Sequence, residues 1–241
     1  MTTAKSTEVI DCLRLHGNLN YAAAVASYGR PFLASLTKAF AGRSMAEKVT
    51  ITEEIRLCLQ IWKSILTVNR GVTFAFLTDA LPRSKNDVFV DASSSLGIGG
   101  ICGSAYFKYS WDELSMVQPD IIARMELLGC LVALICFSDI LSGKIVRFYC
   151  DNENAVAWLR KGRSNNPLGN KFLAYWEFLK YTRECKISPT WLPSSHNCTA
   201  DALSRGRTPR WLRRDGIRKK FDARKLQRGL EDILRLWNTL L

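Results

Sequence analysis

Four carboxylates stand where the surrounding residue types make an unpaired charge unfavourable. Asp91 closes the run Asp-Val-Phe-Val-Asp, and Asp151 closes the run Ile-Val-Arg-Phe-Tyr-Cys-Asp. Glu126 falls on the apolar side of a helical pattern, and Asp201 stands in the run Thr-Ala-Asp-Ala-Leu. An ionised carboxylate in such surroundings is costly unless a cation or another partner lies nearby. These acids are therefore the candidates for chemistry.

Two strands are expected to carry the first pair of acids. The apolar, β-forming residues before Asp91 and Asp151 predict buried strands, and the small residues and glycines after Asp91 predict a tight turn. If the strands are parallel neighbours, both carboxylates emerge at one edge of a sheet, where open α/β sheets place their sites. Residues 121–141 predict a long helix. Its expected buried stripe comprises Ile122, Glu126, Gly129, Ala133 and Phe137.

The remaining patterns complete an α/β fold. Residues 99–109 predict one or two antiparallel strands, residues 187–192 a fifth strand, and residues 200–203 a short helix before the C-terminal part. Helices are expected over 154–161 and 168–184. This order predicts a mixed five-stranded sheet with flanking helices.

Four segments are expected along the chain. Residues 1–70 show helical spacing and predict a small helical domain, in which His16 is interpreted as a packing residue. Residues 71–86 are interpreted as a linker, because they contain Gly and Pro and no clear periodicity. Residues 87–206 form the α/β domain, and residues 207–241 a basic tail.

A group of four acids without matching Lys or Arg residues would repel one another, so stability alone does not favour it. Divalent cations with oxygen ligands resolve this conflict, and Mg²⁺ suits it best. Two such ions can clamp the attacking and leaving oxygens of a phosphodiester. The alternative is that each acid is separately solvated or salt-bridged.

The composition narrows the class of protein. The chain has 241 residues, 47% of them hydrophobic, and a net charge of +12. This charge favours a polyanionic partner, with nucleic acid ahead of an anionic membrane surface. No apolar run is long enough to span a bilayer, and no signal-peptide pattern is present. The 8 cysteines show no CxxC spacing, so reduced core cysteines and an intracellular location are expected, and zinc is not.

The sequence resembles the ribonuclease H domain of retroelement reverse transcriptases of the long-terminal-repeat and DIRS-like types; hepadnaviral polymerases show a related pattern. The resemblance rests on four motifs, of which Asn-x-x-Ala-Asp-x-Leu-Ser-Arg is the most specific: Asp91-Ala92-Ser93, Met125-Glu126-Leu127-Leu128, Asp151-Asn152 and Asn197 to Arg205. Residues 15–22 and 29–33 are similar to the helical segment after the polymerase palm, so the resemblance covers about residues 9–206. No Tyr-x-Asp-Asp polymerase motif occurs in this chain.

The resemblance implies a ribonuclease H-like fold and hydrolysis of the RNA strand of an RNA–DNA hybrid, leaving 5′-phosphate ends. It makes the four acids ligands of two Mg²⁺ ions, with Mn²⁺ as an alternative. Ser93, Asn152 and Asn197 become substrate-side residues, as does the basic loop with Arg160, Lys161 and Arg163. His196 directly precedes Asn197, unlike the mobile His of cellular members, so it is either catalytic or a loop residue at the substrate rim. A separate polymerase chain is a further possible partner; a membrane is not expected.

The sequence leaves alternatives open for the role of the tail and for the function of the protein. The basic tail either grips phosphates, which we favour, or docks on the sheet domain through an apolar stripe of Leu230, Ile233, Leu234 and Trp237. An active hybrid nuclease is the favoured function. The alternatives are a catalytically silent nucleic-acid-binding remnant and a nuclease of the same fold that acts on DNA.

Overall fold

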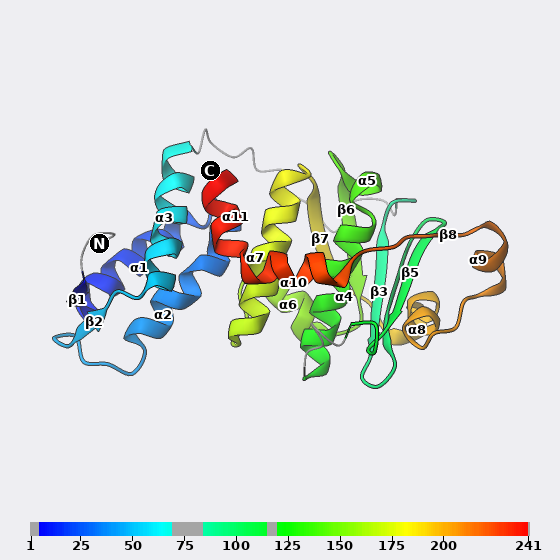
Figure 1. Cartoon of the computed structure of the whole chain (residues 1–241), viewed down its shortest axis with the longest axis horizontal. Coiled ribbons are helices and arrows are strands. Elements are labelled where there is room, and N and C mark those ends of the chain that lie inside the picture. The colour runs from blue at the N-terminus through cyan, green and yellow to red at the C-terminus, as the bar shows by residue number, and fades with distance from the viewer. Residues whose placement is uncertain (1–4, 69–83, 115–119, 241) are drawn as a thin grey trace. The chain divides into compact units, whose positions relative to one another are not determined.

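The computed structural model describes residues 5–68, 84–114 and 120–240 (Figure 1). The expected linker, residues 71–86, therefore lies outside the described residues except for its last three. Contacts divide the chain into two compact units. We call residues 1–75, 162–174 and 231–241 the helical unit, and residues 76–161 and 175–230 the sheet unit. Among the described residues, no helix has both the length and the apolar character needed to cross a membrane.

The helical unit is built from α1 (Val9–Ala22), α2 (Ala34–Phe40), α3 (Glu53–Val68), α11 (Ile233–Leu240) and the first part of α7 (Pro167–Thr182). It also contains the 3-10 helix η1 (Ser27–Leu33) and a small antiparallel pair, β1 (Ser6–Glu8) with β2 (Lys48–Thr50), which the sequence pattern did not predict. His16 packs as expected, since its Nε2 lies 2.9 Å from Thr37 Oγ1 and its ring contacts Phe40 edge-on.

The apolar end of the tail docks in this unit. Helix α11 packs on α3, and Trp237 is fully buried, with its indole N–H donating to the Ala174 carbonyl at 3.1 Å. Ile233 is buried as well. This end of the tail therefore docks, but within the helical unit; the expectation that it docks on the sheet domain was wrong.

The sheet unit contains a six-stranded mixed sheet in the order β7-β6-β3-β4-β5-β8. Its strands are β3 (Val88–Ser93), β4 (Gly97–Cys102), β5 (Ala105–Ser110), β6 (Ile145–Cys150), β7 (Lys186–Trp191) and β8 (Ile217–Arg218). β3, β4 and β5 are antiparallel neighbours, whereas β6 and β7 continue the sheet parallel to β3. The α/β class is confirmed, but the expected number of five strands was wrong. The sixth, β8, pairs parallel with β5 and has only two residues, too few to show a β pattern.

Helices cover both faces of the sheet. α4 (Ile122–Cys136) and α6 (Glu153–Lys161) pack on one face, and α8 (Cys198–Ser204) packs on β3, β4 and β5. The expected helix over 121–141 divides at Phe137 into α4 and α5 (Ser138–Leu141). Ile122 was wrongly placed in the buried stripe, because it is 42% exposed at the first turn of α4. Beyond that turn α4 is buried almost all round, so a one-sided stripe describes it poorly.

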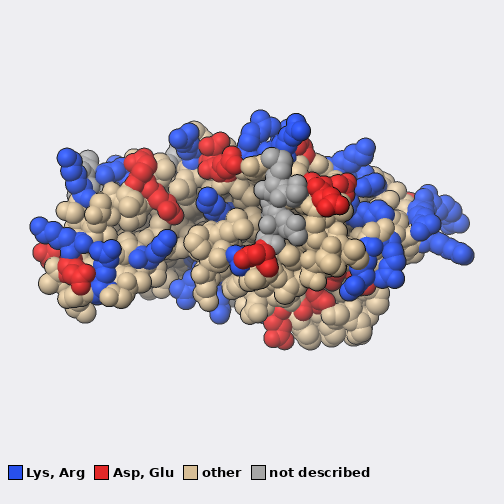
Figure 2. Space-filling view, turned by 60° about the horizontal axis from the view of Figure 1, so that its bottom comes forward, with Lys and Arg blue, Asp and Glu red and all other residues tan. Residues whose placement is uncertain are grey.

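The C-terminal part of the sheet unit follows α8 along the chain. It comprises α9 (Arg210–Asp215), β8 and α10 (Ala223–Glu231). Leu226 and Leu230 of α10 are buried. Figure 2 shows a dense group of Lys and Arg side chains where Figure 1 places α9.

Candidate metal centre

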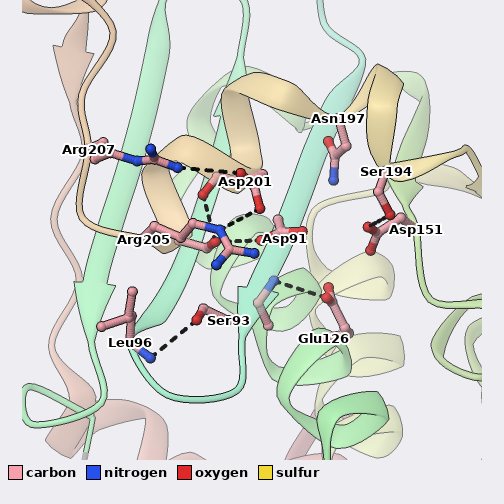
Figure 3. A network of polar contacts seen from close by, with 12 residues as sticks. Asp91, Ser93, Leu96, Glu126, Asp151, Ser194, Asn197, Asp201, Arg205 and Arg207 are labelled. Carbon is pink, nitrogen blue, oxygen red and sulfur yellow. Dashed lines mark hydrogen bonds and ion pairs between the residues drawn. The ribbon is translucent and has the colours of Figure 1, made fainter.

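The first two acids come from neighbouring strands. β3 and β6 are parallel, with Val88 opposite Phe148 and Phe89 opposite Tyr149, as the sequence predicted. Asp151 directly follows β6 and stands level with Asp91 in that register (Figure 3). Asp91 lies inside β3 rather than at its end, because the strand continues to Ser93.

Glu126 reaches the same edge from α4. A Cβ atom on Gly129, one turn further along α4, would lie 2.9 Å from Val90 Cγ1, so this glycine lets the helix approach β3 closely. Glu126 is only 2% exposed. Its Oε1 accepts a hydrogen bond from the Ala92 N–H at 3.0 Å, and its Oε2 lies 3.5 Å from Cys150 Sγ. The glutamate is thus held inside the protein beside both strands.

Asp201 arrives on α8 from the other face of the sheet. Gly99 is the cross-strand partner of Asp91, and a Cβ atom on Gly99 would lie 2.4 Å from the Ser204 backbone nitrogen. This glycine permits the close packing of α8 on β4. As a result, the Ser204 hydroxyl donates to Asp91 Oδ2. Asp201 itself pairs with Arg205 Nε at 2.7 Å and with a guanidinium nitrogen of Arg207 at 3.8 Å (Figure 3).

The site disfavours negative charge at its two buried acids. Burial raises the pKa of Asp91 to about 6, with repulsion from Asp151 and Asp201 adding to the effect. The Ser204 hydrogen bond and the charge of Arg205 oppose it. Burial likewise raises the pKa of Glu126 well above its ordinary value, reinforced by the neighbouring Cys150, Asp91 and Asp151. A cation at this edge would relieve the repulsion and favour the ionised forms.

Ligand atoms of Glu126, Cys150 and Asp151 all lie within 4.8 Å of one another, so this buried group could hold a metal ion. Cys150 was not expected in the site, because an isolated cysteine in an apolar strand resembles any core cysteine. Ser194 was also missed. Its hydroxyl donates to Asp151 Oδ2 at 2.5 Å. Ser204 had a local signal, since it follows Asp201 by three residues in a helix and so lies on the same side.

The three small expected substrate-side residues, Ser93, Asn152 and Asn197, bond to the protein backbone. Ser93 is buried, and its hydroxyl oxygen accepts from the Leu96 N–H at 3.3 Å. Asn152 Oδ1 accepts from the Ala155 N–H at 3.0 Å, which caps the start of α6. Asn197 is 2% exposed and donates from Nδ2 to the Val90 carbonyl at 2.7 Å, so it fixes the loop before α8 to β3. Contact with substrate stays a prediction for all three.

The other expected substrate-side residues are exposed. His196 ends the 3-10 helix η2 (Ser194–His196) and lines a pocket of about 370 Å³ with Phe89 and Ile101. Arg160 donates from Nε to the Pro189 carbonyl at 2.8 Å, and Lys161 ends α6. Arg163 belongs to the helical unit, so the expected basic loop is divided between the two units.

Neither the models of known protein families nor the curated protein sequences contain a match to this chain.

Proposed function

We propose that the protein is a metal-dependent endonuclease of the ribonuclease H-like class, which hydrolyses the RNA strand of RNA–DNA hybrids. The observation that carries the proposal is the convergence of Asp91, Glu126, Asp151 and Asp201 from four separate elements. The order of these elements along the chain also agrees with the motif resemblance. A six-stranded mixed sheet with helices on both faces is compatible with this fold class.

The residues at this edge fit divalent cations. Carboxylate oxygens are the ligands that Mg²⁺ and Mn²⁺ prefer. Burial raises the pKa of Asp91 and of Glu126 and neighbouring acids add to the effect, so a cation here would offset the cost of ionising both groups. The four acids would hold two ions, which together supply water activation and stabilisation of the departing 3′-oxygen. The Cys150 thiol is a softer ligand and less suited to Mg²⁺.

The chain's own residues orient the acids. The Ser204 hydroxyl donates to one oxygen of Asp91 and the Ser194 hydroxyl to one oxygen of Asp151, which fixes the direction of each carboxylate. The two ion pairs of Asp201 hold it at the rim of the group, because Arg205 and Arg207 are both exposed. These contacts fix the directions of the carboxylates before any ligand arrives.

The test is cleavage of labelled RNA–DNA hybrid, duplex RNA and duplex DNA with Mg²⁺, Mn²⁺ or Ca²⁺. We expect the RNA strand of the hybrid alone to be cut, with Mg²⁺ or Mn²⁺, because the 2′-hydroxyl distinguishes RNA from DNA at a site. Asp151→Asn should abolish cleavage, whereas Asp112→Asn, the same change at an exposed residue, should retain it. Nicking of duplex DNA would identify a DNA nuclease instead. Binding without cleavage in any metal would favour the silent nucleic-acid-binding protein.

A further inference from the structure

A basic segment follows the metal centre directly. Between Arg207 and Lys220 the chain carries seven Lys and Arg residues and one acid, Asp215. Arg210, Arg213 and Arg214 all lie on α9 and are exposed. The sequence suggested that the whole tail from 207 to 228 could grip phosphates. Basic residues of α10 are exposed as well, but α9 is the helix that directly follows Arg207 to Pro209, which line a groove together with Asp201.

The fold holds α9 firmly. Leu212 is fully buried against Ile101, Tyr106 and Leu203, and so anchors the helix to the sheet unit. Immediately after α9, the Ile217 N–H donates to the Ser104 carbonyl at 2.9 Å, and β8 pairs with β5. The arginines are thus presented by a fixed element rather than by a loose chain end.

An exposed tryptophan lies among these arginines. Trp211 is 49% exposed, although its neighbour Leu212 is fully buried. Leaving a large aromatic ring in water gives up the free energy of burying it. Exposed Trp and Arg side chains together are typical of interfaces, and Arg with aromatic rings is the pairing that binds nucleic-acid backbone and bases.

A surface groove connects this segment with the acids. It has a volume of about 500 Å³; of the four acids Asp201 lines it, and of the basic segment Arg207 does, just before α9. Asp201 and Ser194, whose hydroxyl donates to Asp151, lie on the side of the metal centre. Arg207, Thr208 and Pro209 form the side that leads into α9. A strand bound beside Asp201 therefore has a path along this groove towards the first residue of α9.

We propose that α9 and Arg207 form a phosphate-binding arm, which holds the backbone of the RNA–DNA hybrid beside the metal centre. The inference rests on the proposed function, because it places the hybrid at the four acids. Arg210, Arg213 and Arg214 contact phosphates, and Trp211 packs on a sugar or on an unpaired base. The arm supplies affinity and register, and the carboxylates carry the chemistry.

The first experiment replaces the three arginines of α9 with glutamine, as R210Q/R213Q/R214Q. The matched control is K144Q/R183Q/K186Q. It removes the same charge from exposed residues of the sheet unit that lie at or just before the starts of β6 and β7, whereas Asp151 follows the end of β6. Hybrid affinity is measured by fluorescence anisotropy in Ca²⁺ at several salt concentrations. Deletion of the tail would be a poor test, because it would also remove the buried Leu212 and Trp237.

Each lost phosphate contact lowers the magnitude of the log–log salt slope by about 0.9. Between about 50 and about 200 mM salt, the unmodified protein should therefore lose roughly 10- to 40-fold more affinity than the arginine variant, for two to three contacts. The matched control should keep the slope of the unmodified protein. Trp211→Ala should weaken binding at every salt concentration and leave the slope unchanged, because the ring carries no charge.

Equal salt slopes for the arginine variant and the matched control would overturn the proposal of a phosphate-binding arm. Failure of the unmodified protein to bind the hybrid at low salt would overturn it as well. Cleavage is measured separately, which distinguishes this inference from the proposed function. A salt slope that depends on the arginines, without cleavage in Mg²⁺ or Mn²⁺, would support the phosphate-binding arm and reject the proposed nuclease activity. Cleavage with no arginine-dependent slope would reject the arm alone.

Discussion

Asp91→Asn should stabilise the metal-free protein, although it destroys the proposed site. Asp91 is 6% exposed, and its pKa lies at about 6 because burial and two neighbouring acids disfavour its ionised form. Asparagine has nearly the same shape and carries no charge. Its side-chain carbonyl can still accept the hydrogen bond that Ser204 donates to Asp91. The substitution therefore removes the repulsion and retains the packing.

The size of the effect follows from the pKa of Asp91. The carboxyl has a pKa of 3.8 when unperturbed and about 6 in the folded protein. At about 1.36 kcal/mol per pKa unit, ionisation above pH 6 would lower the free energy of unfolding by about 3 kcal/mol. Because the folded state binds the proton more tightly than the unfolded state, this contribution to stability is lost as pH rises from 3.8 through 6. At neutral pH, Asp91→Asn should recover up to about 3 kcal/mol.

Urea unfolding in EDTA, measured from about pH 4 to about pH 8, tests this prediction. The variant should be more stable than the unmodified protein above pH 6, and the difference should shrink towards pH 4. Asp112→Asn, on an exposed residue, serves as the control and should change stability little. Addition of Mg²⁺ or Mn²⁺ should stabilise only proteins with an intact site. A variant less stable than the unmodified protein at neutral pH would refute the reasoning and make Asp91 a structural residue.

Two further predictions concern the construction of the site. Gly99→Ala would bring a Cβ atom to 2.4 Å from the Ser204 nitrogen, so α8 must shift. We expect a loss of about 1–3 kcal/mol of stability and of stabilisation by metal, measured by thermal melts. Gly17→Ala, in α1 with no atom within 4 Å of the new Cβ, should keep or slightly raise stability. Separately, metal binding should weaken as pH falls below about 6 and should release protons, because Asp91 and Glu126 must ionise. Titration calorimetry in two buffers of different ionisation enthalpy measures this release, and pH-independent binding would contradict it.

The sequence alone determined the elements that carry the acids. The runs before Asp91 and Asp151 are apolar and β-forming, and such periodicity is a local property that survives in the fold as β3 and β6. Glu126 was recognisable because it interrupts an apolar helical pattern, and it is buried as that pattern implied. The apolar positions of the tail likewise predicted burial, which Ile233 and Trp237 confirm.

Only the tertiary structure decided the contacts that tune the site. Ser204 and Asp91 are 113 residues apart, and Ser194 and Asp151 are 43 apart, so no local pattern links them. The same holds for Cys150, whose side chain lies beside Glu126 only because α4 packs on β3 and β6.

The division of the basic tail was also decided by the tertiary structure. In the sequence, basic and apolar residues are interspersed over 207–235, and helical patterns occur on both sides of residue 220. Both α9 and α10 bury their leucines and leave their basic residues exposed, but α9 directly follows the residues that line a groove with Asp201 and is fixed by Leu212 and by the two-residue strand β8. A strand of two residues takes its hydrogen bonds from β5 and has no pattern of its own. Tertiary contacts, and not local residue preferences, therefore set the position of the α9 arginines in the sheet unit.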